Sequence, residues 1–338
     1  MNVGIIGLGY MGATHLRAFL HSPGVQVAAI CSSDPKKHNG DFSGVRGNFH
    51  RNVSPLDLRE VAKYTDPGAL IDHPGLDAVS ICVPTDLHAP IASRALQAGL
   101  DVLLEKPMAL TAAACDALQE DAAERGLILM IGHVLRFWPE YLTLAEFIHA
   151  HGAARIRHAT FQRRGPVPRS PWFRQRSSSG GALLDLLIHD IDQALQLFGW
   201  PVAVEARDAP GFDAVESVLH YDSGLSVSIE GGWMDETFPF AMSFHANSDE
   251  GTLHLSNTGV LTAQSNTGSS LIIENTGADP FQTEVDYFVS CCRDRTQPER
   301  CPPSHAAKAV KLALLLSNSR IHYGAMIDCK EEPAPAVA

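Results

Sequence analysis

The chain has 338 residues, with 26 basic and 38 acidic side chains and a formal net charge of −12. An acidic chain without a run of basic residues is not suited to a nucleic-acid surface, so we expect no nucleic-acid partner. No apolar run reaches 18 residues, and the first residues resemble a strand, so we expect neither a membrane span nor export. The seven scattered cysteines lack a C-x-x-C spacing, which is typical of reduced thiols in a cytoplasmic protein.

Residues 1–135 alternate short β-branched runs with helical patterns, which predicts βαβ units around a parallel sheet. The predicted strands are Val3–Ile6, Gln26–Cys31, Ala78–Val83, Val102–Leu104 and Leu127–Ile131. The predicted helices are Gly12–Leu20, His88–Ala98 and Thr111–Arg125, the last with the Thr111 hydroxyl as its N-cap. The segment Lys37–Leu58 is rich in Gly, Asn and Pro and has little periodicity, so we expect a long loop there.

Residues 136–330 have a different pattern, which predicts a second domain of α+β class with a mostly antiparallel open sheet. Turn signals separate seven strand-like segments, and helical patterns precede and follow them. The predicted strands are Val202–Arg207, Val215–Tyr221, Leu225–Gly231, Phe240–Ala246, Gly251–Leu255, Val260–Ala263 and Leu271–Glu274. The predicted helices are Glu140–Ala150, Gly181–Phe198, Phe281–Arg293 and Ser304–His322. Residues 331–338 contain two prolines, and we expect a disordered tail.

A glycine motif stands between the first predicted strand and the first predicted helix. Gly7, Gly9 and Gly12 form G-x-G-x-x-G, with Tyr10 and Met11 inside the motif. The first glycine permits a tight turn, the second lets the backbone approach a pyrophosphate, and the third permits close helix packing. The N-terminus of the helix then supplies the anion site. The motif predicts a Rossmann-type NAD(P)-binding domain over residues 1–135.

The end of the second predicted strand bears on the choice of cofactor. A carboxylate there accepts the ribose 2′-hydroxyl of NAD, whereas hydroxyls and cations accommodate the 2′-phosphate of NADP. Ser32 and Ser33 occupy this place, Lys36 follows, and Asp34 comes two residues late. The pattern favours NADP and leaves NAD open.

Two further segments carry ionisable side chains. Lys106 follows Glu105 and precedes Pro107 at the predicted carboxyl edge of the parallel sheet, where such sheets bind ligands. On the predicted helix Gly181–Phe198, Asp185, His189 and Asp192 fall within roughly 60° of one another. A helix that is apolar nearly all round is buried, so these groups form either an internally satisfied network or a site. A metal site usually needs one more strong donor, and we expect no metal.

The combination of motifs resembles the Gfo/Idh/MocA family of sugar and polyol oxidoreductases. The resemblance covers about residues 1–200. It runs from the glycine motif through Pro84-Thr85-x-x-His88, Glu105-Lys106-Pro107 and Arg136-Phe-x-Pro139 to Gly180-Gly181-x₃-Asp185-x₃-His189-x₂-Asp192. Two departures are the Lys37–Leu58 loop, where the family usually has a helix, and the turn at 132–136, which lacks a common asparagine.

The resemblance implies that Lys106, Asp185 and His189 act together on the substrate. With the residue patterns, it gives two sets of candidate residues. The candidates for cofactor binding are Gly7, Gly9, Tyr10, Met11, Gly12, Ser32, Ser33, Lys36, Pro84, Thr85, His88, Glu105, Lys106 and Arg136. The candidates for substrate binding are Lys106, Arg164, Trp172, Asp185, His189 and Asp192.

These residues predict an NAD(P)-dependent dehydrogenase that moves hydride between nicotinamide and a secondary hydroxyl or ketone of a sugar or polyol. A neutral imidazole at His189 suits a general base near neutral pH, and Lys106 suits the developing alkoxide. Two alternatives remain: a glycosidase that retains NAD for transient oxidation and elimination, and a non-catalytic NAD(P) or sugar sensor. The sequence does not identify the sugar.

The second domain also predicts self-association. Its helices suffice to cover one face of the sheet, and Val227 and Ile229 alternate with Ser226 and Ser228 along one strand. We expect the uncovered face to carry apolar residues such as Val227 and Ile229, because an exposed apolar sheet needs a partner. A homodimer, or a homotetramer built from it, is the expected assembly.

Overall fold

The computed structural model describes residues 1–45, 47–48, 54–274, 277 and 279–329. The chain forms two compact units, one of residues 1–134 with 279–307 and the other of residues 135–278 with 308 onward. The segment 279–307 therefore belongs to the first unit, whereas the sequence analysis places it in the second domain. The physical reason is the packing of helix α9 (Pro280–Asp294) on α1 (Tyr10–His21). There, Phe288 meets Phe19 edge to face, with ring centroids 6.3 Å apart.

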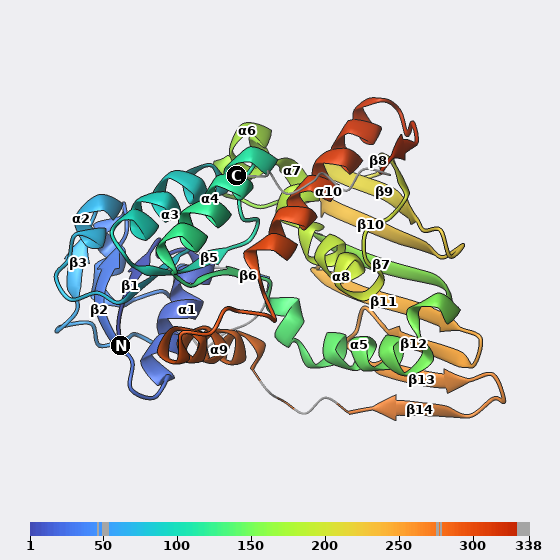
Figure 1. Cartoon of the computed structure of the whole chain (residues 1–338), viewed down its shortest axis with the longest axis horizontal. Helices are drawn as coiled ribbons and strands as arrows, with labels where there is room; N and C mark the ends of the chain where they lie inside the picture. The colour runs from blue at the N-terminus through green and yellow to red at the C-terminus, as the bar shows by residue number, and fades with distance from the viewer. Residues whose placement is uncertain (46, 49–53, 275–276, 278, 330–338) are drawn as a thin grey trace. The chain divides into compact units, whose positions relative to one another are not determined.

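The first unit is built on a six-stranded parallel sheet in the order β3-β2-β1-β4-β5-β6, which confirms the predicted Rossmann-like domain. Every residue of β4 and β5 is buried, as expected for a sheet with helices on both faces (Figure 1). Thr111 Oγ1 accepts the amide of Ala114 and caps α4. The strands are β1 Asn2–Ile6, β2 Gln26–Cys31, β3 Ala62–Tyr64, β4 Ala78–Ile81, β5 Asp101–Glu105 and β6 Leu129–Gly132. The helices besides α1 and α9 are α2 Pro67–Ile71, α3 His88–Gln97 and α4 Ala112–Arg125.

The segment expected to be a long loop begins with a single short helix. Asp34 accepts the amide of Lys36 and caps a 3-10 helix at Pro35–Asn39. The described residues between 40 and 61 form no helix or strand, while 46 and 49–53 lie outside the described residues. The short strand β3 then completes one edge of the sheet.

The second unit is built on a nine-stranded sheet in the order β14-β13-β12-β11-β7-β10-β9-β8-β15. Its centre is β7 (Ile156–Pro166), which the sequence analysis does not predict. β7 pairs parallel with β10, and the other neighbouring strands pair antiparallel. The other strands are β8 Ala203–Ala209, β9 Asp213–His220, β10 Ser226–Met234, β11 Ala241–Ser248, β12 Gly251–Leu255, β13 Leu261–Ser265, β14 Ser270–Ile273 and β15 Ile327–Asp328.

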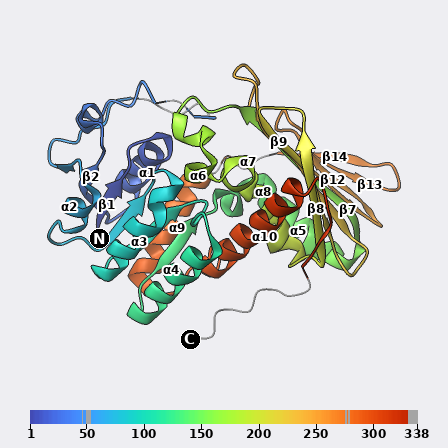
Figure 2. The same cartoon turned by 90° about the horizontal axis from the view of Figure 1, so that it is seen from above.

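Helices of the second unit cover one face of this sheet, as Figure 2 shows. They are α5 Pro139–His151, α7 Gly181–Asp185, α8 Ile188–Phe198 and α10 Pro303–Ile321, the last beginning in the first unit. The short helix α6 Arg176–Ser179 packs instead against α7 and the 3-10 helix at Pro171–Arg174. Val227 and Ile229 are completely buried in β10, which α8 contacts. The expectation of an apolar open face was therefore wrong: the half-buried side chains that alternate with Val227 and Ile229 are Ser226, Ser228 and Glu230.

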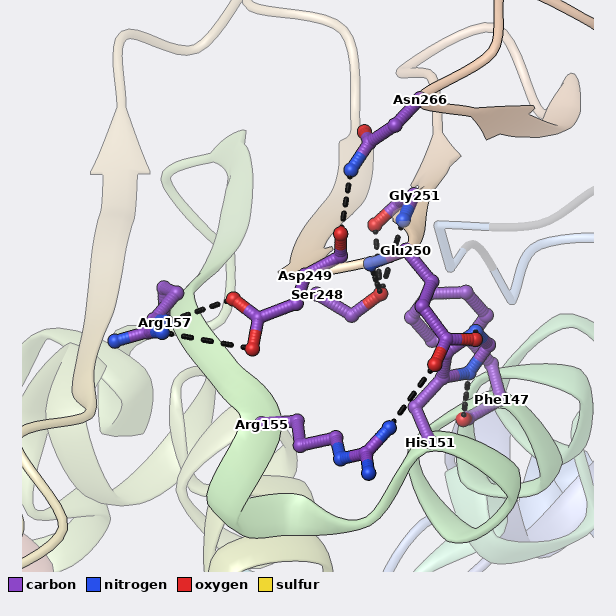
Figure 3. A network of polar contacts seen from close by, with 9 residues as sticks. All are labelled: Phe147, His151, Arg155, Arg157, Ser248, Asp249, Glu250, Gly251 and Asn266. Atoms are coloured by element: carbon purple, nitrogen blue, oxygen red, sulfur yellow. Dashed lines mark hydrogen bonds and ion pairs between the residues drawn. The ribbon is translucent and has the colours of Figure 1, made fainter.

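Figure 3 shows how polar contacts fix the β11–β12 turn of the second unit. Ser248 Oγ accepts the amides of Glu250 and Gly251 at 3.2 and 3.1 Å. Arg157 binds the carboxylate of Asp249, and Arg155 binds that of Glu250 at 3.0 Å. These ion pairs lie at the surface, where such pairs contribute little to stability.

No described helix is long and apolar enough to cross a membrane. All seven cysteines carry free thiols. The predicted disordered tail, 331–338, lies outside the described residues.

Candidate functional site

The glycine motif forms a tight turn from β1 into α1. Gly7 has φ +91°, and a Cβ there would lie 2.4 Å from the Cys82 carbonyl oxygen. A Cβ on Gly12 would lie 1.7 Å from the Gly7 carbonyl oxygen, so helix and turn touch. A Cβ on Gly9 would meet nothing within 4 Å, and Gly9, as the N-cap of α1, has no side chain that could cap the helix. Open space beside a helix N-terminus fits the pyrophosphate of a dinucleotide.

The end of β2 presents hydroxyls rather than a carboxylate at the strand terminus. Ser32 is buried, and its Oγ accepts the amide of Asp34 at 3.2 Å. The Asp34 carboxylate in turn accepts the amide of Lys36 at 3.1 Å. Asp34 is thereby used as a helix cap, while Ser33 and Lys36 are exposed.

His88 links the ends of two neighbouring parallel strands. Its ring is 1% exposed, with Nδ1 2.8 Å from the Pro107 carbonyl oxygen and Nε2 2.9 Å from the Val83 carbonyl oxygen. Burial lowers the pKa of His88 although both carbonyls oppose that change. His88, a predicted cofactor-binding residue, thus holds the backbone that follows Lys106. Of the other candidates in this segment, Thr85 is buried and Pro84 is half-buried.

Glu105 ends β5 in the interior, and Lys106 beside it is half-buried. Glu105 Oε1 lies 3.1 Å from His15 Nε2, and Oε2 accepts the Lys106 amide at 3.2 Å. His15 and Lys106 outweigh burial and lower the pKa of Glu105, which keeps this carboxylate ionised. His15 was not among the site residues predicted from the sequence.

Asp213 explains the glycine at position 181, the first residue of α7 in the second unit. Its carboxylate accepts the Ala182 amide at 2.8 Å and binds Arg176 and Arg320 at 2.9 and 2.6 Å. Gly181 has φ +76°, and a Cβ there would lie 2.8 Å from Asp213 Oδ2. Burial raises the pKa of Asp213, but the amide and Arg320 outweigh it and lower the pKa overall. Asp213 therefore anchors the start of α7, and nothing in the local sequence signals this role.

The predicted single helix over 181–198 was wrong, because the structure has two helices, α7 and α8, separated at Leu186 and Leu187. The Leu187 amide reaches back five residues to the Ala182 carbonyl oxygen at 2.8 Å, so the α-helical repeat is interrupted. A uniform 100° rotation from Asp185 to His189 therefore does not hold. Asp185 ends α7 and is buried, whereas His189 lies in the first turn of α8 and is half-buried.

Two buried arginine–aspartate pairs hold α8. Arg136 donates from Nε and Nη2 to the two carboxylate oxygens of Asp192, at 2.8 and 2.7 Å. Arg163 on β7 donates in the same manner to Asp190, at 2.7 and 2.9 Å, and also to Tyr141 Oη. All four charged side chains of the two pairs are at most 3% exposed. Both aspartates follow His189 closely in sequence. The Arg163–Asp190 pair was not predicted from the sequence.

The remaining predicted residues lie elsewhere in the second unit. Arg164 alternates with Arg163 on β7, is partly exposed and lies 4.0 Å from Glu230. It therefore occupies the face opposite that of Arg163 and α8. Trp172 stacks on Phe173 with centroids 3.8 Å apart, in a 3-10 helix at Pro171–Arg174. In the described part of the chain, no three His, Cys, Asp or Glu side chains form a metal-binding group.

Two family models match this chain. Residues 1–133 match the oxidoreductase family with an NAD-binding Rossmann fold, and residues 141–254 match the GFO/IDH/MocA C-terminal domain. The glycine turn and the two sheets define an NAD-binding oxidoreductase of two domains. The chain belongs to the Gfo/Idh/MocA family.

Relatives and solved structures agree with this assignment. The chain is 26% identical to a scyllo-inositol 2-dehydrogenase (NAD(+)) from Bacillus subtilis, over 87% of this chain and 86% of the relative. It is 30% identical to the oxidoreductase YdgJ from Escherichia coli, over 67% of this chain but only 62% of the relative's length. A structure of aldose-aldose oxidoreductase from Caulobacter crescentus shares the fold, with TM-score 0.80 and 21% identity over 97% of this chain and 99% of that one.

Replacement of Asp192 by asparagine should destabilise the protein strongly. The buried Arg136 guanidinium would lose its anionic partner, which typically costs about 3 to 5 kcal/mol. Chemical denaturation measures the change, and Asp249→Asn in an exposed pair is the control that should leave the unfolding midpoint in place. Should Asp192→Asn unfold at the same midpoint as the wild type, the pair does not hold α8.

Proposed function

We propose that this protein is an NAD(P)-dependent dehydrogenase that oxidises a secondary hydroxyl of a sugar or polyol, or reduces the corresponding ketone. The bound nicotinamide accepts the hydride from the carbon in oxidation and returns it in reduction. One relative is named a scyllo-inositol 2-dehydrogenase, and this name supports the proposed substrate class. Two observations carry the proposal. The first unit has an open glycine turn, and in the second unit the helix that contains His189 is held by two buried ion pairs.

His189 is the general base in this proposal. As the carbon loses hydride, the hydroxyl oxygen becomes a carbonyl and its proton passes to the imidazole. Asp185 orients the ring and stabilises the imidazolium. Lys106 donates a hydrogen bond to the oxygen while negative charge develops on it. Asp192 was also predicted to bind substrate, and its bidentate bond to Arg136 favours a role in holding α8 instead.

Lys106→Ala or His189→Ala should lower kcat by about 10² to 10⁴, the usual contribution of one acid–base group. Cofactor affinity should change little, because Lys106, although a candidate for cofactor binding, is not assigned to the pyrophosphate, and neither is His189. Steady-state assays with sugars and polyols give kcat, and fluorescence titration gives the cofactor Kd. His322→Ala, an exposed histidine at the end of α10, is the control. Near-normal kcat in either site variant would remove that residue from the mechanism, and glycoside cleavage without net cofactor reduction would favour the glycosidase.

NADPH should bind more tightly than NADH. The Ser32 hydroxyl and the exposed Lys36 suit a 2′-phosphate, while the Asp34 carboxylate is engaged with the Lys36 amide. Ser32→Asp should reverse the order by placing a carboxylate against the phosphate, and Asp34→Asn is the matched comparison. Fluorescence titration with both cofactors measures the effect. Equal or tighter binding of NADH by the wild type would mean that Asp34 contacts the ribose.

The protein should act in the cytoplasm with its thiols reduced. It should form a homodimer, or a homotetramer made from it, through the open face of the second unit's sheet. In the described part of the chain, helices cover only one face (Figure 2), and the other carries Ser226, Ser228 and Glu230. Light scattering should give at least twice 36.5 kDa, and Ser228→Arg should dissociate the assembly. A 36.5 kDa mass at micromolar wild-type protein would refute this assembly.

A further inference from the structure

Three ionisable side chains from three different elements meet in the interior of the first unit. His15 lies on α1, Glu105 ends β5, and Glu284 lies on α9, with exposed fractions of 0%, 5% and 0%. His15 Nε2 is 3.1 Å from Glu105 Oε1 and 4.0 Å from Glu284 Oε2. One imidazole thus faces two carboxyl groups at a place that water does not reach. Neither His15 nor Glu284 has a role in the proposed reaction.

The surroundings of the His15 ring favour its charged form, the imidazolium. Nδ1 lies 2.8 Å from Ser80 Oγ and 3.5 Å from Cys82 Sγ, so each ring nitrogen has an acceptor within reach. Burial by itself would lower the pKa of His15, but Cys82 and Glu105 outweigh it and raise the pKa well above its usual range. His15 and Glu105 therefore form a buried ion pair.

Glu284 completes the group as a neutral carboxyl. Neither of its carboxyl oxygens has a hydrogen-bond partner among the described residues. With both glutamates ionised, the interior would hold two anions against one cation, an expensive arrangement in a dry environment. Burial, with a further contribution from Glu105, raises the pKa of Glu284 to about 8 although His15 opposes this. At neutral pH the group is balanced, with one cation, one anion and one protonated carboxyl.

The ion pair acts on the backbone of Lys106. Glu105 Oε2 accepts the Lys106 amide, and buried His88 contacts the carbonyl of the next residue, Pro107. If Glu284 ionises, His15 is drawn toward a second carboxylate and its hold on Glu105 weakens. Among the described residues, the other charged and titratable groups that act on His15 or Glu105 are Cys82 just after β4, His88 on α3 and Lys106 itself.

We propose that Glu284 is a positioning residue which, while it carries a proton, keeps the His15–Glu105 pair intact and the Lys106 backbone in its place. Ionisation of Glu284 under alkaline conditions releases that backbone and lowers turnover. The link to turnover rests on the role proposed above for Lys106; the link to the Lys106 backbone does not.

The pH dependence has a definite sign. The folded protein binds the Glu284 proton more tightly than the unfolded chain, whose carboxyl has a pKa near 4.5. Stability from this group therefore falls as the pH rises from about 4.5 and levels off above about 8. Glu284→Gln cannot ionise, so the variant should gain in melting temperature over the wild type as the pH rises through that window.

Hydrogen exchange at the Lys106 amide tests the backbone link without any substrate. At pH 9 roughly nine in ten wild-type molecules would carry ionised Glu284, so the protection factor should fall roughly tenfold between pH 7 and 9. Glu284→Gln should keep its protection, and His15→Gln should lose it at both pH values. Asp294→Asn, an exposed carboxylate on the same helix, should follow the wild type. Equal protection in wild type and Glu284→Gln at pH 9 would overturn the proposal.

The pH profile of kcat at saturating cofactor tests the link to turnover. The kcat of the wild type should fall at alkaline pH with an apparent pKa near 8. Glu284→Gln should keep at least about half of the wild-type kcat at pH 7. In this variant, the pH at which kcat falls should be higher by about one pH unit or more. His15→Gln should lower kcat about ten- to a hundredfold, the usual effect of a misplaced group. An unchanged alkaline limb in Glu284→Gln would overturn the positioning role. If protection follows Glu284 and yet Lys106→Ala turns over normally, the proposed role of Lys106 fails while the buried network stands.

Discussion

The placement of α8 depends on charged groups that have no access to water. Asp190 and Asp192 project from the first turns of this helix into the interior, where each needs a cation. Arg163 from the central strand β7 and Arg136 from the segment before α5 supply these cations through paired hydrogen bonds. Burial lowers the pKa of Arg163, but Asp190 and Tyr141 outweigh it and raise the pKa, so the guanidinium stays charged. Because bidentate pairs fix direction as well as distance, they restrict how α8 can rotate or slide, and His189 moves only with it.

The first unit uses the same physical device beside Lys106, the other side chain proposed to act on the substrate. The carboxylate of Glu105 accepts the backbone amide of Lys106, and the carbonyl of the next residue, Pro107, contacts His88. Glu105 is in turn held by His15, and protonated Glu284 balances the charge. In both units the side chain assigned to chemistry is partly exposed, while the groups that hold its element are fully buried. Rigid support behind an accessible side chain is what a preorganised site requires.

The sequence predicts those parts of the fold that depend on local signals. The glycine turn follows from a strand, three spaced glycines and a helix pattern, and the β-branched runs identify five of the six parallel strands. The strand β7 was missed because Arg157, Arg163 and Arg164 hide its alternation, and Arg163 occupies a buried position usually taken by an apolar residue. The break between α7 and α8 at Leu186 and Leu187 could not be predicted, because two leucines continue the apolar pattern of a helix without a residue that signals a break. Asp213 and Glu284 lie far along the chain from the residues they serve, so only the tertiary fold shows their roles.

In the proposed mechanism, Lys106 and His189 act on the same substrate oxygen. A crystal structure of the protein with NADP and a polyol tests it most directly. We expect one hydroxyl oxygen within about 3.2 Å of both Lys106 Nζ and His189 Nε2. Its carbon should lie about 3 to 3.5 Å from nicotinamide C4. The proposed mechanism would be contradicted if the polyol lies against the nicotinamide but its nearest hydroxyl is held by other side chains, with Lys106 and His189 out of reach.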